Sequence, residues 1–361
     1  MEAKSASRPG FSRIERLILV AIAVVTGVAG LTRYAGGVSQ VLAFALATLS
    51  LAGLAWMVSF ATEQVGRRFG PAVTGFLQST IGNLPEFFVV IFALNAGQRI
   101  VAQTAILGSI LVNALLVLGA VIVTGALRER DGVMRFGARL PNDTATLLLT
   151  SSFIIVLIGL TISSHDLASR HTQTISIVGA VALLLVYGTW VRQYLTSDER
   201  PGELVERPRL STIMAVVLLV VAGTASAFVS DWFVHALQPT IHTLHISQAF
   251  AGLVIVAIAG NAVENVAGIV LAHNGRSDLA ISVVKNSVAQ IAAFLYPLLV
   301  LVSLLTATRL TFALAPVYIG ALIGTAVIVW QITGDGEATV FEGAALIATF
   351  VILATVASFE T

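Results

Sequence analysis

The sequence contains no cysteine among its 361 residues, and only 11% of its residues are charged. The absence of cysteine excludes disulfides, thiolate metal sites and cysteine nucleophiles. The charged fraction lies far below the roughly 25% that is typical of soluble domains. A soluble chain of this length needs more charge to cover its surface, so the composition indicates that lipid surrounds most of it. The net charge of +1 gives no indication of a nucleic-acid partner.

Long apolar runs take the place of charge, because 57% of the residues are hydrophobic. A helix needs roughly 20 apolar residues to cross the hydrocarbon of a bilayer. Runs such as IMAVVLLVVAG do not alternate as the strands of a membrane barrel do. The sequence therefore predicts an all-α polytopic membrane protein with about eleven transmembrane helices. The expected spans are 17–32, 38–62, 71–95, 100–126, 144–163, 171–194, 211–230, 246–273, 279–306, 310–331 and 341–359.

Lysine and arginine are distributed unevenly between the two sides of these spans. Fifteen of them fall on the side of the N-terminus and four on the other side, while Lys285 lies inside a span. Because basic residues in short loops accumulate in the cytoplasm, we expect the N-terminus to be cytoplasmic. No clear cleavage site follows the first apolar run, so we expect a retained first helix. We expect an integral protein of a bacterial inner membrane.

The expected spans divide the chain into two halves. Residues 1–37 hold the N-terminal tail and the first helix, and residues 38–195 form the first half. The hydrophilic stretch around 196–210 predicts a cytoplasmic linker, and residues 211–361 form the second half. Each half is expected to contain one copy of a repeat, at about 71–126 and about 246–306.

A short pattern recurs after 178 residues, in the third and the eighth expected spans. Five spans separate the two copies, so they enter the membrane from opposite sides. Inverted repeats with interrupted helices and polar groups at mid-membrane depth are typical of secondary transporters. The repeated pairs are Gly82 and Gly260, Asn83 and Asn261, Glu86 and Glu264, and Ser109 and Ser287.

Glu86 and Glu264 place carboxylates inside apolar spans, where a charge costs several kcal/mol. Pro85 removes a backbone donor and interrupts the first of these spans, which frees carbonyl oxygens to line a cavity. Carboxylate, carbonyl and amide oxygens together suit a hard cation such as Ca²⁺. We expect the two glutamates to be the metal ligands. Neutral oxygens are expected from Asn83, Asn261, Ser109, Asn113, Ser287 and Gln290, although each alone is also a common helix–helix hydrogen-bonding residue.

Two carboxylates in a low dielectric repel each other and therefore hold protons when no cation is present. A divalent cation displaces those protons, since metal ligands must be deprotonated. The sequence thus predicts one site with two alternative occupants and a conformational change that exposes it to either side. No cofactor is expected beyond the transported ions, and the expected partners are lipid and inorganic cations. Substitution of either glutamate by glutamine is expected to abolish transport with the fold intact.

The segments GNLPEFFVVIFALNAG (82–97) and GNAVENVAGIVLAHNG (260–275), with the residues that follow them to 119 and 298, resemble the two α-repeats of cation/proton exchangers. These exchangers form a branch of the calcium/cation antiporter superfamily. The resemblance implies one helix followed by two inverted five-helix halves, and export of cytoplasmic Ca²⁺ in exchange for protons. It also implies that Glu86 and Glu264 carry both ions and that the six neutral residues line the pathway.

Several positions depart from the family pattern. Asn265 stands where many members have a histidine, and Leu84-Pro85 fill the middle of the first motif. Lys285 stands where an apolar residue is common, and we expect its ammonium to snorkel to the cytoplasmic interface. Pairing with a glutamate and a direct role toward the ion are the alternatives for this lysine. We treat Lys285, Asn265 and Pro85 as possible modulators of the site, together with Gly82 and Gly260.

Other functions are compatible with the same residues. Na⁺-coupled or monovalent-cation exchange remains open because of Asn265 and Lys285. An intramembrane enzyme would use the two glutamates as acid and base, and a channel would hold the pathway open. The enzyme is least supported, because the remaining candidates for catalysis cluster in or near the non-cytoplasmic loops and lack the spacing of a zinc motif. These candidates are His165, His171, His235, His242 and His245.

Overall fold

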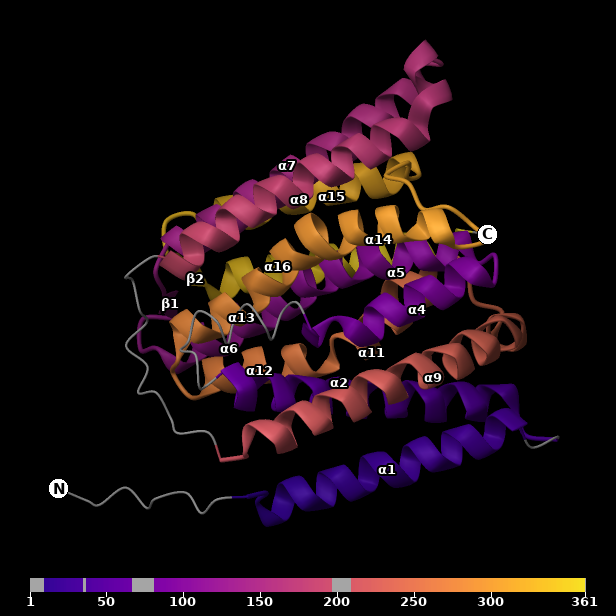
Figure 1. The fold of residues 1–361 in the computed structure, drawn as a ribbon. Helices are drawn as coiled ribbons and strands as arrows, with labels where there is room; N and C mark the ends of the chain where they lie inside the picture. The colour runs from indigo at the N-terminus through magenta and orange to yellow at the C-terminus, as the bar shows by residue number, and fades with distance from the viewer. Residues whose placement is uncertain (1–9, 35–36, 67–80, 197–208, 361) are drawn as a thin grey trace.

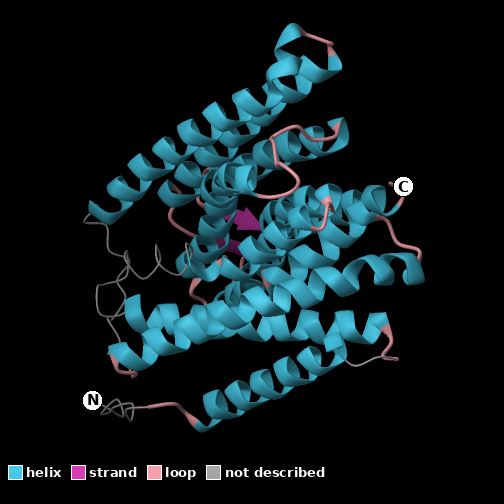
Figure 2. Cartoon of the chain, turned by 45° about the vertical axis from the view of Figure 1, so that its right-hand side comes forward, coloured by secondary structure: helices cyan, strands magenta, loops and turns pink. Residues whose placement is uncertain are grey.

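The protein is a helical bundle, described here from a computed structural model for residues 10–34, 37–66, 81–196 and 209–360. Figure 1 shows the helices running roughly side by side, with the start of α1 at one end of the bundle and the end of α16 at the other. Figure 2 shows that helices make up almost all of the described chain, with one small pair of strands among them. The all-α prediction is therefore confirmed.

The first half of the chain begins with a helix that precedes the repeat. The elements of this half are α1 Arg13–Tyr34, α2 Gln40–Gly66, α4 Leu84–Asn95, α5 Arg99–Leu111, the π-helix η1 Val112–Val117, α6 Leu118–Arg128, β1 Val133–Arg135, α7 Arg139–Ser163, the 3-10 helix η2 Leu167–His171 and α8 Thr172–Thr196.

The second half follows the same order of long helices. Its elements are α9 Thr212–Leu244, α10 Gln248–Phe250, the π-helix η3 Ala251–Val256, α11 Ala257–Gly260, α12 Ala262–His273, α13 Ser277–Gln290, the π-helix η4 Ile291–Leu295, α14 Tyr296–Val302, the 3-10 helix η5 Ser303–Leu305, α15 Pro316–Thr333, β2 Glu337–Thr339 and α16 Val340–Ser358.

Within the described ranges, nine helices are long and apolar enough to cross a membrane, and a bent pair over 248–273 makes a tenth span. The third expected span, 71–95, is described only from residue 81 onward, where α4 forms its second part. We call the end of the bundle that holds the start of α1 the proximal face and the opposite end the distal face. Successive spans then alternate in direction between these faces, as expected for a polytopic membrane protein.

Two expected spans differ most from the structure in their bounds. The seventh was expected at 211–230, but α9 continues to Leu244. Its added turns include the buried residues Phe233 and Leu237, so they continue the span through the bundle. The tenth was expected from residue 310, but α15 begins at Pro316, whose fixed φ suits the first position of a helix.

The two copies of the repeat have the same local structure at the offset of 178 residues. Helix α4 spans 84–95 and α12 spans 262–273, while α5 begins at residue 99 and α13 at residue 277. Gly97 and Gly275, which end the turns between these helices, both have φ of +74°, a conformation that favours glycine. The π-helices η1 and η4 also begin at equivalent positions, give or take one residue.

Helix α1 lies at one edge of the bundle against α2 and α9, whereas α7, α8 and α15 lie at the other edge (Figure 1). The segment α5–η1–α6 is the most buried of the long spans and forms the centre. At the proximal face β1 pairs antiparallel with β2, with Met134 opposite Ala338. This pairing joins the α6–α7 connection to the α15–α16 connection, so it links the two halves of the chain at this face.

Candidate functional site

The helix break in each repeat lies deep in the bundle and is made by an asparagine. Asn83 precedes α4 with φ −82° and ψ 9°, and Asn261 precedes α12 with φ −98° and ψ 11°. The chain bends by 57° across the second break. Pro85 sits in the first turn of α4, where its missing N–H is not needed for a helical hydrogen bond. Two half-helices therefore begin at these interruptions.

Glu86 lies in the first turn of α4, and its side chain is only 7% exposed. Ser109 Oγ of α5 donates a hydrogen bond of 2.5 Å to Glu86 Oε1. Asn261 Nδ2, from the break in the second repeat, donates to the same oxygen at 2.5 Å. Because the partial positive charge of a helix N-terminus favours an anion in the first turn, the local structure and both donors stabilise a carboxylate at this position.

Asn113, in the π-helix η1, connects this group to the second repeat. Its Nδ2 donates to Asn261 Oδ1 at 2.8 Å, to Ser109 O at 2.9 Å and to Ser287 Oγ of α13 at 3.3 Å. A π-helical turn shifts the side chains that follow it and is frequent at functional sites. The structure thus brings five candidates, Glu86, Ser109, Asn113, Asn261 and Ser287, into one hydrogen-bonded network that draws on both repeats.

Two buried amide oxygens of the candidate set accept no hydrogen bond in the described part of the chain. These are Asn113 Oδ1 and Gln290 Oε1, and their side chains are 1% and 2% exposed. A buried acceptor without a donor has a free-energy cost of about 1–3 kcal/mol. A cation is one group that satisfies such oxygens. Asn83, at the break that precedes α4, is also buried.

The side chain of Glu264 lies outside the described part of the structure. Its backbone is in the first turn of α12, three residues after Asn261. Each glutamate therefore occupies the third residue of its half-helix, with Leu84 and Ala262 as the first residues. The prediction that both carboxylates act on one ion stays a prediction.

The glycine before the second break allows close approach to Glu86. A Cβ atom on Gly260 would lie 2.9 Å from Glu86 Cγ and 3.0 Å from Oε1. No real side chain fits there without displacement of the carboxylate. Gly82 holds the equivalent place before Asn83, and Asn265 lies on α12 with an Oδ1 that has no hydrogen-bond partner in the described ranges.

The expectation that Lys285 snorkels to the membrane interface is wrong. Its side chain is 1% exposed, and Nζ has no hydrogen-bond partner among the described residues. Lys285 lies two residues before Ser287 on α13. Because successive helical residues turn by about 100°, it lies on roughly the opposite face of α13 from the network. The lysine is buried behind the site, not at a helix end in water.

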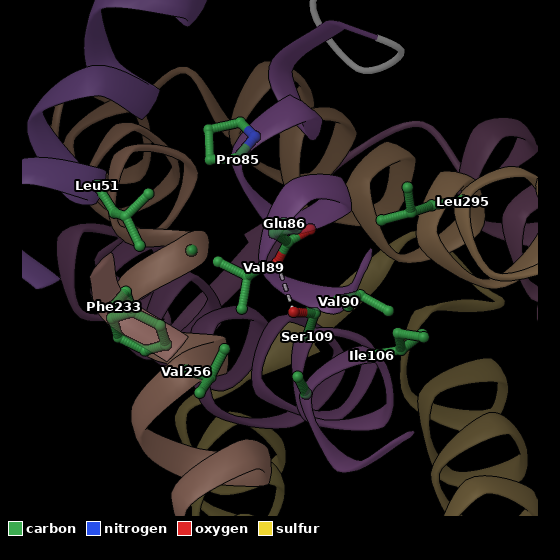
Figure 3. A pocket seen from close by; sticks show the side chains of 13 residues that line it. Leu51, Pro85, Glu86, Val89, Val90, Ile106, Ser109, Phe233, Val256 and Leu295 are labelled. Atoms are coloured by element: carbon green, nitrogen blue, oxygen red, sulfur yellow. Dashed lines mark hydrogen bonds between the residues drawn. The ribbon is translucent and has the colours of Figure 1, made fainter. Parts of the chain in front are cut away.

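An apolar cavity adjoins the network, and its lining includes Glu86, Ser109 and Gly260. Figure 3 shows Glu86 and Ser109 joined by a hydrogen bond, with apolar side chains of several helices around them. The volume available to the centre of a water molecule is about 20 Å³. The helices that line the cavity include α2 and α9, which contribute Leu51 and Phe233.

Leu51 and Phe233 could not be identified from the sequence motifs, because α2 and α9 carry no polar pattern at these positions. The π-helices were also missed, since a π-turn has no distinct hydrophobic period. The five histidines near the distal face belong to no group of three or more His, Asp or Glu that could hold a metal within the described ranges.

Residues 39–192 and 214–359 match the family described as sodium/calcium exchanger protein. A vacuolar calcium ion transporter of Schizosaccharomyces pombe is 32% identical over 86% of this chain and 77% of its own length. The Ca²⁺/H⁺ antiporter ChaA of Bacillus subtilis is 29% identical over 86% of this chain and 90% of its own length. The solved structure of native YfkE superposes with a TM-score of 0.78 at 25% identity, over 96% of this chain and 99% of that chain. The chain belongs to the sodium/calcium exchanger family.

Proposed function

We propose that the protein is a secondary active transporter that exchanges cytoplasmic Ca²⁺ for H⁺ by alternating access. Glu86 and Glu264 are its shared proton and cation carriers. The observation that carries this proposal is the hydrogen bond from Asn261 Nδ2 to Glu86 Oε1, which joins the two helix breaks at one buried carboxylate. The names of the relatives from fission yeast and Bacillus subtilis support calcium as the cation and protons as the counter-ion.

The chemistry of the site supports a hard cation. Ca²⁺ takes six to eight oxygen ligands at about 2.3–2.6 Å, from carboxylates, amides and carbonyls. Glu86 supplies a carboxylate, and Asn113 and Gln290 hold amide oxygens without donors in the described structure. Glu264 is the third residue of α12, as Glu86 is of α4, so the two glutamates occupy equivalent backbone positions in the inverted repeats.

Exchange follows from competition at the carboxylates. A proton on Glu86 removes the charge that attracts Ca²⁺, and a bound Ca²⁺ requires the deprotonated form. The site therefore holds either protons or the metal ion. If each occupied form crosses between the two access states more readily than the empty charged form, transport of one ion is coupled to transport of the other.

The same proposal places the protein in a bacterial inner membrane with the proximal face in the cytoplasm. The excess of basic residues on that face supports the orientation. The partners are lipid and inorganic cations, and the transported ions take the place of a cofactor.

The proposal is tested by flux into proteoliposomes with an imposed pH gradient. Wild-type protein is expected to accumulate Ca²⁺ against its gradient. Glu86→Gln and Glu264→Gln are expected to abolish accumulation, although both variants remain monodisperse and unfold cooperatively on heating. Glu129→Gln, on the exposed proximal surface, is the matched control and is expected to transport normally. Normal exchange by either of the first two variants would rule out the shared carboxylates.

Na⁺-coupled or monovalent-cation exchange is the second candidate. The description of the family as sodium/calcium exchanger favours it. Ca²⁺ uptake driven by a Na⁺ gradient at equal pH on both sides would select this candidate. Uptake driven by a pH gradient in Na⁺-free buffer would select proton exchange.

A further inference from the structure

We propose that Leu51, Val89, Ile106, Phe233 and Val256 form a hydrophobic barrier that keeps hydrated cations on the distal side away from Glu86 in this conformation. We call these five residues the distal barrier. The inference rests on the proposed function, because it assigns to the apolar cavity the task of keeping cation exchange coupled.

The direction of each helix places the cavity on the distal side of Glu86. Helix α4 runs from its buried start to its distal end at Asn95, so Val89 lies nearly one turn distal to Glu86. Helix α5 begins at the distal face, so Ile106 lies nearly one turn distal to Ser109. In the same way Val256 precedes Gly260 on the segment that enters from the distal face. All of these residues line one cavity with Glu86 (Figure 3).

The walls of this cavity cannot replace the water ligands of a cation. Apart from Glu86 and Ser109, the residues that line it have apolar side chains or none. The volume of about 20 Å³ is enough for about one water molecule. Apolar cavities of such size stay dry, and apolar constrictions close ion pathways by excluding water. A hydrated Ca²⁺ therefore meets a barrier here, although the carboxylate lies directly behind it.

The equivalent region of the second repeat is packed differently. At the offset of 178 residues, Val90 corresponds to Gly268 and Ile106 corresponds to Val284. A Cβ atom on Gly268 would lie 3.0 Å from Val284 Cγ2 and 3.2 Å from Val121 Cγ2. Helix α12 thus rests directly against α13 and α6. The larger side chain of Val90, in contrast, lines the cavity of the first repeat. Val284 is consequently a matched control position with the same depth and burial.

The test introduces polarity into the barrier with little change of shape. Threonine has nearly the volume of valine but carries a hydroxyl group, so the pair Val89→Thr and Val256→Thr is expected to admit water. The chain has no cysteine, so Ala259→Cys, which lines the same cavity, supplies the sole thiol as a reporter. The small thiol-reactive cation Ag⁺ is added from the distal side. After a set time the protein is unfolded and treated with maleimide. The fraction of thiol that Ag⁺ has protected from maleimide is then measured by mass spectrometry.

Ala259→Cys alone is expected to react slowly with Ag⁺, and the added Val89→Thr/Val256→Thr pair is expected to raise the rate severalfold. Val284→Thr is expected to leave the rate unchanged. Ser164→Cys, which is exposed between α7 and α8, reports that the distal face is accessible to the reagent. Equal Ag⁺ rates with and without the threonine pair, or a fast rate in Ala259→Cys alone, would overturn the barrier.

Proteoliposomes give the second readout, which is the number of protons moved for each Ca²⁺. The threonine pair is expected to lower this ratio, because Ca²⁺ leaks through the wetted cavity, while Val284→Thr keeps the wild-type ratio. An unchanged ratio in the threonine pair would refute the role in coupling. If wild-type protein shows no exchange, the proposed function fails, and the Ag⁺ rates still decide whether the barrier exists.

Discussion

Asn261 of the second repeat and Glu86 of the first are joined by a hydrogen bond of 2.5 Å, although 175 residues separate them in the sequence. Asn261 also donates to Ser109 Oγ at 3.0 Å and to Ala257 O at 2.9 Å. The asparagine that interrupts one helix therefore orients the carboxylate of the other repeat. A network built in this way links the side chain of Glu86 to the position of the second repeat.

Substitution Asn261→Ala tests this relationship. It removes the amide donor to Glu86, and a hydrogen bond to a charged group contributes about 1.5–3 kcal/mol. We expect the Ca²⁺ concentration for half-maximal exchange to rise by about tenfold or more, since about 1.4 kcal/mol corresponds to a factor of ten. The measurement is the initial rate of Ca²⁺ uptake against Ca²⁺ concentration at fixed pH.

Asn274→Ala is the control for that series. Asn274 is exposed and follows the C-terminal end of α12, so the same change of side chain occurs away from the network. It is expected to show wild-type uptake. Equal uptake curves for the two alanine variants would show that Asn261 does not position the carboxylate.

Gly260→Ala places a methyl group where the structure has room only for hydrogen. The new Cβ would lie 2.9 Å from Glu86 Cγ, so the carboxylate must shift. Misplacement of a reacting group by about 1 Å can reduce a rate by up to about a hundredfold, and we expect exchange to fall by at least about tenfold. The protein should still fold, because alanine favours a helix over glycine.

Gly324→Ala in α15 is the matched change for comparison, since no atom lies within 4 Å of the added methyl group. We expect wild-type exchange and equal or slightly higher thermal stability for this variant. Rapid exchange by Gly260→Ala would mean that Glu86 tolerates displacement and that its position is not critical.

Gly119 and Gly343 form a reciprocal close contact between α6 and α16. A Cβ on Gly119 would lie 2.6 Å from Gly343 O, and a Cβ on Gly343 would lie 2.8 Å from Gly119 O. Small residues allow membrane helices to approach this closely, and overpacking at such a contact costs about 1–3 kcal/mol. We expect Gly343→Ala to lower the midpoint of thermal unfolding in detergent, whereas Gly320→Ala, with open space around it, keeps it. An unchanged midpoint for Gly343→Ala would show that α6 and α16 can move apart without loss of stability.

The helix pattern and the inverted repeat could be predicted from the sequence because both have a direct signal. Apolar runs of about 20 residues mark the spans, and the recurrence of Asn83 and Glu86 after 178 residues marks the breaks. Both signals are local, and the physical chemistry of a lipid environment leaves few alternatives to a helix. The interruption of the third span was predicted in the same way from the missing N–H of Pro85, and the break lies at Asn83, just before α4.

The barrier and the buried lysine could not be predicted, since both depend on tertiary packing. Phe233 reaches the cavity because α9 packs against α4 and α2, and no motif records that contact. The distance of Lys285 from the start of its span suggested an escape to water. The neighbouring helices close that route, and the side chain is buried. Which face of a helix meets another helix is not encoded in hydropathy alone.

Substitution Lys285→Met tests the cost of the buried lysine. Methionine has a similar length and no polar group, so the change removes a buried nitrogen that has no hydrogen-bond partner in the described chain. Because an unsatisfied buried polar group costs about 1–3 kcal/mol, we expect the midpoint of thermal unfolding in detergent to rise. Lys285→Gln keeps a polar group at the same position and is expected to gain less. Ca²⁺/H⁺ exchange should persist in Lys285→Met, since the residue lies on the face of α13 away from Ser287. A stabilised protein without exchange would instead show that the lysine is retained for transport, at the expense of stability.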